Sequence, residues 1–417
     1  MRLLIVADDL TGAMDTGIKF ADRGITVQVF PSAVFEEENL REETEAVVVN
    51  TKSRHLPVNE AYRAVYGVIQ KALAAGCTAV YKKTDSGLRG LTGAEIAAAC
   101  DACGCGAVFA PALPAVGRVT VGGIHYCDGV PVAESAFGAD PIDPVKHSAV
   151  EEIIAETAPE GTKTRVASGP GAFMPEGREI VICDAQTDEE LGEIADVVLG
   201  EAGDVLPVLC GCAGFADALA DRLPFENHPH GPSAGAAKTL FLAGSLHPVT
   251  EQQIRTARTA GVACWHVNAA DLLDPAGFEE GRGRAARAFE KTMAALQAEG
   301  RAIFAVEREN AMDDASAAAW AAGIPAEEVP ERITATFAAA ARRALQTDAS
   351  TRLFLTGGDT LTAVLEALGV TEITPLAELR RGIVEMELNT KDFGSVRAVS
   401  KAGGLGTSAD VAEILTE

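Results

Sequence analysis

The sequence predicts an α/β fold composed of two α/β domains with mainly parallel sheets. Its 417 residues exceed what one hydrophobic core ordinarily supports, since domains of roughly 150 residues are typical. Short β-branched runs alternate with Ala-rich helical patterns along most of the chain, as in βαβ units with a parallel sheet. The stretch 225–237, rich in Pro, Gly and His, interrupts this alternation and is the best candidate for a linker.

The first domain is expected to span residues 1–230. Its strand patterns are 3–7, 26–30, 46–50, 79–82, 107–110, 179–183 and 207–210. Its helical patterns, with apolar residues at three- and four-residue spacing, are 12–22, 58–75, 93–103 and 189–199. The segment 121–143 is dense in Gly and Pro, which predicts a hairpin-like excursion over the site. Within it, we expect His125 to be a hydrogen-bonded turn residue and not a catalyst.

The second domain is expected to span residues 238–417. Strand patterns occur at 239–243, 262–267, 302–306 and 353–356. Helical patterns occur at 248–259, 283–298, 333–345 and 360–368. The renewed alternation predicts a second α/β domain with a parallel sheet.

Composition narrows the class of protein. Hydrophobic residues make up 47% and charged residues 23% of the chain, which is ordinary globular composition. The formal net charge of −25 argues against nucleic acid or an anionic membrane as partner. Nine irregularly spaced cysteines indicate reduced thiols in a cytoplasmic protein. No apolar run approaches the roughly 20 residues of a membrane span, and no zinc spacing occurs among the cysteines.

Four polar segments each follow a strand pattern of the first domain. These segments are 8–12, 51–54, 82–86 and 111–118. In an open parallel sheet, loops at the carboxyl ends of neighbouring strands open onto one crevice, so their side chains are predicted to share one pocket. The charged candidates are Asp8, Asp9, Arg54, Lys82, Lys83, Asp85 and Arg118.

This mixture of cations and carboxylates suits one kind of chemistry. Arginine and lysine hold a carboxylate or phosphate, while an aspartate can accept a hydroxyl proton as general base. The pattern therefore favours a hydroxylated carboxylic acid as ligand, with Asp8 or Asp9 as base and Asp85 either catalytic or orienting the lysines. Simpler interpretations are an N-cap at Asp9, a solvated Arg54 and a salt-bridged strand end at 82–83.

Three strand–helix junctions of the second domain carry glycine or small residues. They are 243–248, 356–360 and 401–406, the last of which contains Gly403. Glycines at such junctions let backbone N–H groups approach a phosphate, although each could also be a tight turn. Together they predict a nucleotide phosphate site. Neither GxxxxGK[ST] nor GxGxxG occurs at a matching position, which weakens a dehydrogenase interpretation.

Nine motifs follow one another along the chain: ADDLTGAMDTG (7–17), NTKSRHLP (50–57), YKKTDSGLRG (81–90), PALPAVGRVTVGG (111–123), GVPVAES (129–135), CDAQTDEEL (183–191), GSLHPVTEQQI (244–254), TGGDT (356–360) and KAGGLG (401–406). In these motifs the chain resembles the four-carbon acid sugar kinase family over nearly its whole length. Gly87 and Leu91 replace the Thr and Asn usual in that family, and Asp359 replaces the usual Glu.

The resemblance implies ATP-dependent phosphorylation of a hydroxyl on a tetronate such as threonate, erythronate or 3-oxo-tetronate. It implies that the acid is held by Asp9, Arg54, Lys82, Lys83, Thr84 and Asp85. It implies that ATP is contacted by Ser245, Gly357, Gly358, Asp359, Thr360 and Gly404. Mg²⁺ would bridge the phosphates, and the active site would lie in an interdomain cleft that excludes water.

Other functions stay open on the sequence. The chain could be a non-catalytic sensor of small acids with a degenerate nucleotide domain, or a kinase of a different small hydroxy acid. A nicotinamide-dependent oxidoreductase of hydroxy acids is a third alternative. The sequence also leaves open the stereoisomer of the acid, the hydroxyl that is phosphorylated and the oligomeric state, a homodimer included.

Overall fold

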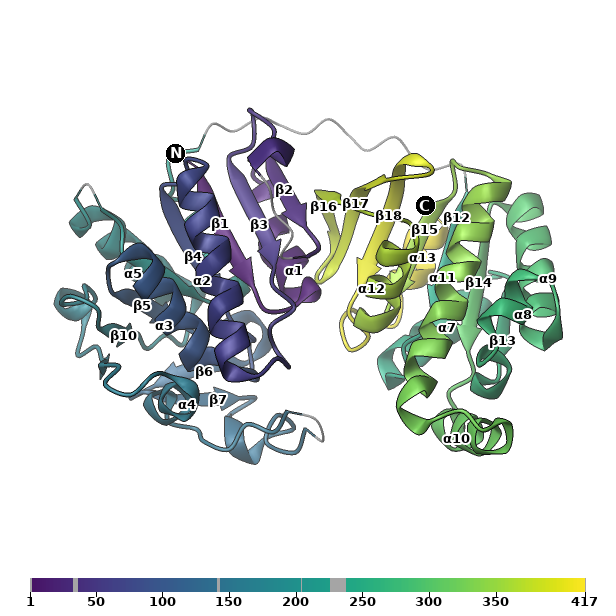
Figure 1. Ribbon diagram of the computed structural model, residues 1–417, viewed down its shortest axis with the longest axis horizontal. Coiled ribbons are helices and arrows are strands. Elements are labelled where there is room, and N and C mark those ends of the chain that lie inside the picture. The colour runs from purple at the N-terminus through teal and green to yellow at the C-terminus, as the bar shows by residue number, and fades with distance from the viewer. Residues whose placement is uncertain (1, 33–36, 141–142, 204, 226–237, 417) are drawn as a thin grey trace. The chain divides into compact units, whose positions relative to one another are not determined.

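The computed structural model describes residues 2–32, 37–140, 143–203, 205–225 and 238–416 (Figure 1). The chain divides into two compact units, Met1–His230 and Gly231–Glu417. Each unit is a mixed α/β structure with a largely parallel sheet, which confirms the predicted fold class. The predicted linker 225–237 lies, beyond Phe225, outside the described residues.

The first unit has an eight-stranded sheet in which every pairing is parallel. Its strands run in the order β2 (Val27–Phe30), β3 (Ala46–Asn50), β1 (Leu3–Ala7), β4 (Ala79–Lys83), β11 (Val208–Gly211), β5 (Ala107–Ala110), β10 (Ile180–Ile182) and β9 (Thr164–Val166). Ala7, the last residue of β1, is in register with Asn50 of β3 and Lys83 of β4. The residues that follow these three strands therefore begin side by side at one edge of the sheet.

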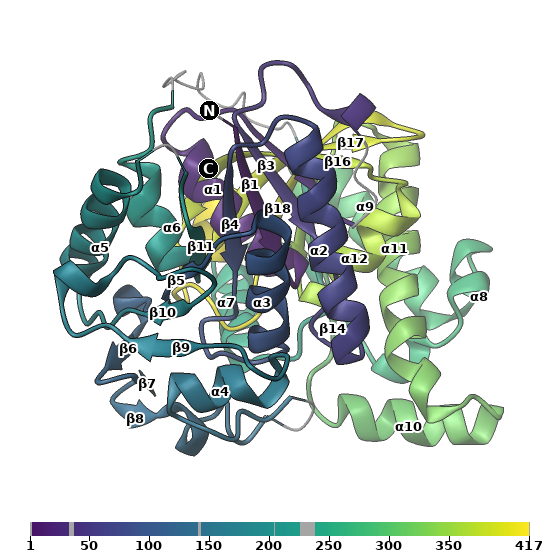
Figure 2. The same cartoon turned by 60° about the vertical axis from the view of Figure 1, so that its left-hand side comes forward.

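Helices cover both faces of this sheet because its strands are apolar on both sides. The helices are α1 (Leu10–Ala21), α2 (Val58–Ala74), α3 (Thr92–Cys103), α4 (Val150–Thr157), α5 (Asp188–Glu201) and α6 (Ala213–Ala220). Leu4, Val6 and Val49 pack with α2 and α3 in one core cluster, and these two helices lie side by side (Figure 2). Helix α1 covers the other face, where Gly17 lies against Val48.

A small antiparallel sheet follows β5. It consists of β6 (Arg118–Val121), β7 (Ile124–Cys127) and β8 (Val130–Pro131). Gly122 and Gly123, both with positive φ, connect β6 to β7, as a two-residue hairpin turn requires. This arrangement confirms a hairpin, which begins at Arg118, before the predicted segment 121–143. Its position over the site stays a prediction.

The second unit has a seven-stranded mixed sheet. Its order is β13 (Cys264–Val267), β14 (Arg301–Val306), β12 (Thr239–Ala243), β15 (Arg352–Thr356), β18 (Gly394–Lys401), β17 (Ile383–Thr390) and β16 (Glu372–Arg380). The first five strands pair in parallel, and β17 pairs antiparallel with both β18 and β16. Thr356 is in register with Ala243 and Lys401, so the three glycine-bearing junctions begin at the same edge.

The helices of this unit match the predicted ones and add others. They are α7 (Pro248–Thr259), α8 (Pro275–Glu279), α9 (Gly283–Glu299), α10 (Ala311–Ala322), α11 (Val329–Thr347), α12 (Gly358–Ala367) and α13 (Asp410–Thr416). Helix α11 begins four residues before the predicted start, with Pro330 in its first turn, where proline is tolerated. Strands β16 and β17 and helices α8 and α10 were not predicted, while β18 and α13 were implied, without bounds, by the predicted strand–helix junction 401–406.

The cysteines and the length and polarity of the helices bear on two further expectations. All nine cysteines are free thiols, as predicted for reduced cysteines. In the part of the chain that the structure describes, every helix is too short or too polar to cross a membrane.

Candidate active site

The first part of the site lies at the carboxyl edge of β1. Asp9 is the N-cap of α1, with extended backbone (φ −140°, ψ 162°), and its Oδ1 accepts a hydrogen bond from Gly12 N at 2.8 Å. The simple capping interpretation of Asp9 is therefore correct, but it occupies only one carboxylate oxygen. Oδ2 of Asp9 is left for a second interaction.

Arg54 supplies that interaction and joins three predicted segments. Its Nε donates to Asp8 Oδ2 at 2.7 Å and its Nη1 donates to Asp9 Oδ2 at 2.9 Å. Its Nη2 lies 3.6 Å from Asp85 Oδ1. The Arg54 side chain is 13% exposed, so it is not the solvated surface charge that was considered as an alternative.

Asp85 is held mainly by its own loop. Arg89 donates to both Asp85 oxygens at 3.0 Å, and Gly87 N donates to Oδ2 at 3.1 Å. Burial alone would raise the pKa of Asp85, but the hydrogen bond from Arg89 and the charge of Arg54 lower it well below its usual value. A carboxylate that is so fully engaged orients its neighbours and is a poor proton acceptor.

The two predicted lysines have different surroundings. Lys82 is completely buried; its Nζ lies 2.9 Å from Glu95 Oε2 and donates to Val6 O at 3.2 Å. Lys83 Nζ donates to Thr84 O at 2.8 Å and packs against Gly12, since a Cβ on Gly12 would lie only 2.9 Å from it. Lys83 therefore lies beside Asp9 at the first turn of α1. Lys82 points to the opposite face of β4, where it pairs with Glu95 of α3.

Glu95 was missed by the sequence reasoning. It lies in α3, is almost wholly buried and accepts hydrogen bonds from Ser53 Oγ and Lys82. Burial raises its pKa even though Lys82 opposes the shift. A signal was available, because Glu95 is the first of only two acids in the otherwise small and apolar helix α3, where an unpaired carboxylate would be costly.

Asp8 and Asp9 differ in acidity. Burial would raise the pKa of Asp8, but the charges of Arg54 and Lys82 hold it below its usual value. Burial and the neighbouring negative charge of Asp8 raise the pKa of Asp9. Such a separation is common where one carboxylate must stay ionised and another must exchange a proton.

Two buried oxygens of this region accept or donate no hydrogen bond within the described residues. They are Asp8 Oδ1 and Thr84 Oγ1, on residues at most 3% exposed. Buried polar atoms are normally satisfied. Both atoms, at the ends of β1 and β4, therefore have hydrogen-bonding capacity left for the hydroxyl groups of a ligand.

The remaining first-unit candidates lie around Phe137. The guanidinium groups of Arg89 and Arg118 lie 5.1 and 5.3 Å from the centroid of its ring. Arg118 also lies 3.2 Å from Asp128, so it reaches the Arg54 cluster only through Phe137 and Arg89.

His125 is hydrogen-bonded at both nitrogens, to Thr120 Oγ1 and Ser86 O, each at 3.0 Å. Burial lowers the pKa of His125 to about 4.

The three glycine-bearing junctions of the second unit converge. A Cβ added to Gly244 would overlap Thr360 Oγ1, and one added to Gly403 would overlap Ser245 Oγ. Gly357 has φ +104°, and a Cβ there would lie 3.5 Å from Ser245 N. Ser245 and Thr360 are thus packed against bare backbone from the neighbouring loops, an arrangement that we call the glycine cradle (Gly244, Ser245, Gly357, Thr360 and Gly403).

Two helices begin at the glycine cradle. Helix α7 is capped by His247, whose Nδ1 accepts from Val249 N at 3.2 Å, and α12 begins at Gly358. Helix N-termini favour anions. Beside them, the hydroxyl of Thr356 is wholly buried and has no hydrogen-bond partner among the described residues.

A cavity of about 320 Å³ opens at the glycine cradle. Of the predicted nucleotide ligands, Ser245, Gly357, Asp359 and Thr360 line it. A Cβ on Gly404 would lie 3.2 Å from His247 Nε2, which places Gly404 at the cap of α7 instead.

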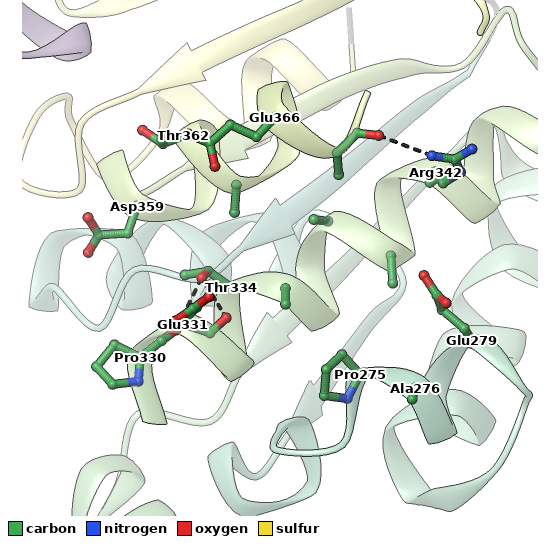
Figure 3. A pocket seen from close by; sticks show the side chains of 15 residues that line it. Pro275, Ala276, Glu279, Pro330, Glu331, Thr334, Arg342, Asp359, Thr362 and Glu366 are labelled. Carbon is green, nitrogen blue, oxygen red and sulfur yellow. Dashed lines mark hydrogen bonds between the residues drawn. The ribbon is translucent and has the colours of Figure 1, made fainter. Parts of the chain in front are cut away.

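A larger cavity of about 1020 Å³ continues between α8, α11 and α12 (Figure 3). It shares Pro330, Thr334 and Asp359 with the smaller one. Six of its fifteen lining residues are alanines, and Arg342 is held by a hydrogen bond of 3.1 Å to Ala367 O.

The fold defines a protein of two α/β units, one with aspartates clustered around Arg54 and the other with the glycine cradle. Comparison with protein families gives the same division. Residues 3–219 match the sugar-binding N-terminal domain, and residues 240–409 match the nucleotide-binding C-terminal domain. The chain belongs to the four-carbon acid sugar kinase family, and it is a kinase.

Relatives of known activity align over nearly the whole chain. The D-threonate kinase of Salmonella typhimurium is 29% identical, with 100% of this chain and 98% of that protein covered. The D-erythronate kinase of Heliobacterium modesticaldum is 30% identical (98% and 94% covered), and the D-threonate kinase of Bordetella bronchiseptica is 31% identical (96% and 94%).

A solved structure shares the fold. A crystal structure of a Salmonella typhimurium protein superimposes with a TM-score of 0.82 at 22% identity, with 98% of each chain covered. An identity of 22% supports a shared fold alone.

Proposed function

We propose that this kinase transfers a phosphoryl group from ATP to a hydroxyl of a four-carbon sugar acid of the threonate, erythronate or 3-oxo-tetronate class. The observation that carries the proposal is the joining of Asp8, Asp9 and Asp85 by one arginine, Arg54, at the end of β1. Relatives named for D-threonate and D-erythronate support the acid class.

Binding of the acid is assigned to the cations that border Asp9. Lys83 and Arg54 carry the charge that a carboxylate needs. Asp8 Oδ1 and Thr84 Oγ1 each have room for a hydrogen bond with a hydroxyl of the acid. The positive charge of Lys82 helps to keep Asp8 ionised, and Asp85 holds the side chains of Arg54 and Arg89 in position. Arg118 lies at the edge of the site, where its guanidinium contacts the Phe137 ring.

The general base is assigned to Asp9. Its side chain is 29% exposed whereas that of Asp8 is 3% exposed, so a hydroxyl can reach it. Its raised pKa makes it the better proton acceptor of the pair. Asp8 remains ionised and disfavours a second negative charge beside it, which is what raises the pKa of Asp9.

The glycine cradle fits the phosphates of ATP, which supplies the group transferred. Gly244, Gly357 and Gly403 let Thr360 and Ser245 pack closely against the neighbouring loops at two helix N-termini, and the buried Thr356 hydroxyl has an unused hydrogen bond. The predicted contacts at Ser245, Asp359 and Thr360 line the same cavity. We assign the nucleoside to the larger cavity, which shares Pro330, Thr334 and Asp359 with this one.

The described residues contain no cluster of three His, Cys, Asp or Glu that could hold a metal ion. We therefore assign Mg²⁺ no ligand set on the protein. Mg²⁺ would bind to the phosphates of ATP, as is general in phosphoryl transfer. The interdomain cleft stays a prediction.

The test is a coupled ADP-release screen over aldonates of three to five carbons. Four-carbon acids should give the highest kcat/KM, and replacement of Arg54 by Gln should abolish turnover. ADP release that is independent of any acid, or that is highest with three- or five-carbon acids, would contradict the proposal.

A further inference from the structure

Lys401, the last residue of β18, is a buried lysine that the proposed function does not use. It is 3% exposed. Its Nζ donates to Ala402 O at 2.9 Å and Gly403 O at 3.0 Å, and lies 3.4 Å from Thr250 Oγ1. These three acceptors account for the three hydrogens of an ammonium group.

What Lys401 lacks is a counter-charge. Among the described residues, no carboxylate oxygen lies within 4.0 Å of its Nζ, whereas the equally buried Lys82 has Glu95 at 2.9 Å. Asp410 at the start of α13 is the acid that acts on it, but Asp410 is hydrogen-bonded to Thr407. A buried charge without a partner is costly, and burial lowers the pKa of Lys401 to about 8.

The surroundings of Lys401 are those of the glycine cradle. Thr250, in the first turn of α7, donates from Oγ1 to Gly403 O at 2.9 Å, so this carbonyl is held from two sides. Gly403 itself packs against Ser245. The Ala402 and Gly403 carbonyl oxygens both accept a hydrogen bond from the ammonium, so their negative ends are compensated. A free carbonyl there would repel phosphate.

We propose that Lys401 is the positioning residue of the glycine cradle, and that the phosphates of a bound nucleotide supply its missing counter-charge, so that nucleotide binding takes up a proton in weakly alkaline solution. This inference rests on the proposed nucleotide binding by the second unit. Its physical basis is the convergence of one uncompensated ammonium and two helix N-termini on the same loops.

The direction of the proton movement follows from the charges present. In the free protein, burial favours the neutral amine above pH 8, and Asp410 opposes this only in part. A nearby polyanion favours the ammonium and raises the pKa. The other titratable groups at the cradle are Asp359, which lines its cavity, and His247. Burial and the charge of Lys401 lower the pKa of His247, so its imidazole is neutral at pH 8.5 in the free protein.

Isothermal titration of the full chain with ADP and Mg²⁺ at pH 8.5 tests the inference. Repeating the titration in buffers of different ionisation enthalpy gives the number of protons exchanged. With a pKa of about 8 in the free protein, wild type should take up roughly 0.7 of a proton per ADP. Binding of ADP without proton uptake would overturn the inference and leave the proposed function intact.

Variants separate the role of Lys401 from a general effect of charge. Lys401→Met should weaken ADP binding by about tenfold to a hundredfold, as loss of a charged hydrogen-bonding group does, and should abolish proton uptake. Lys401→Arg should keep most of the affinity but take up no proton, because arginine stays charged. Lys291→Met, at an exposed position on α9, should match wild type in both.

The remaining outcomes are decisive as well. If Lys401→Met fails to fold, the wild-type proton count still decides. Equal ADP affinity in wild type and folded Lys401→Met would overturn the inference. Absence of ADP binding by wild type would overturn the proposed function, and this inference with it.

Discussion

Arg54 donates from Nε to Asp8 Oδ2 at 2.7 Å, across 46 positions of sequence. The parallel register of β1 and β3 creates this pair, because Asp8 and Thr51 follow strand ends that lie side by side. The same guanidinium also binds Asp9. One residue therefore controls the position and the charge of both candidate aspartates.

Replacement of Arg54 by Gln should destabilise the protein strongly. Removal of one partner from a buried ion pair typically costs about 3–5 kcal/mol, and here Asp8 and Asp9 would both lose their cation. Urea denaturation should show the loss. Arg222→Gln is the control, because Arg222 and Asp196 form an exposed pair expected to contribute at most about 1 kcal/mol. Equal effects of the two substitutions would contradict the assigned role.

The Lys82–Glu95 pair should behave as structural support. Lys82→Met leaves Glu95 buried without its cation, so we expect a loss of about 3–5 kcal/mol in the free energy of unfolding. The double variant Lys82→Met/Glu95→Leu should recover most of that loss, because neither charge remains. A double-mutant cycle measures the coupling; simple additivity of the two single changes would contradict the prediction.

Gly87 and Phe137 should be coupled. A Cβ on Gly87 would overlap the Phe137 ring, so Gly87→Ala should cost about 1–3 kcal/mol through overpacking. Phe137→Ala in the same chain should relieve this part of the loss. Gly67→Ala is the control, since no atom lies within 4 Å of its added Cβ and Gly67 lies within α2. That change should raise stability by about 0.5–1 kcal/mol.

Asp8 should control the acid limb of the pH–rate profile. Asp9 must be deprotonated to accept a proton, so kcat/KM should fall as the pH drops below its raised pKa. Asp8→Asn removes the negative charge that raises this pKa, so the acid limb should move to lower pH. The pH dependence of kcat/KM for both proteins gives the result; an unmoved limb, or one moved to higher pH, would show that Asp9 is not the base.

Gly357 should be required for nucleotide binding. Gly357→Ala strains a backbone with φ +104° and puts a methyl group next to Ser245, so ADP affinity should fall by about tenfold or more. Gly261→Ala carries comparable strain at φ +89° with no neighbour within 4 Å. It should lower stability without changing ADP affinity, and an equal loss of affinity in both would refute the assignment.

The parallel strands were predictable because they are short, buried on both faces and flanked by polar residues. No bounds were predicted for the three strands within 372–401, because their pattern differs. β16 and β17 carry charged residues such as Glu372, Glu378 and Glu387 along a long hairpin, so they lack the continuous apolar run of a buried parallel strand. Their partners are adjacent in sequence, with Arg380 opposite Ile383 and Thr390 opposite Gly394, so the charged residues and not the distance between strands obscured them.

The four loops of the first site were predictable from strand order, but the roles of single side chains were not. Lys82 and Lys83 were both expected in the pocket, although neighbouring residues of a strand point to opposite faces. Lys82 accordingly meets Glu95 of α3, while Lys83 meets Gly12 of α1. Phe137 lies 50 residues beyond Gly87, and only the folded chain shows that the two are in contact.

This kinase is expected to phosphorylate a four-carbon sugar acid with Asp9 as proton acceptor. Phosphorus-31 NMR of wild type with ATP, Mg²⁺ and each four-carbon acid tests it most directly, with Asp9→Asn as the comparison, because asparagine retains the N-cap of α1. A new phosphomonoester signal should appear with wild type and form at least about a hundredfold more slowly with Asp9→Asn. Absence of that signal with every four-carbon acid, or its formation at the wild-type rate by Asp9→Asn, would contradict the account.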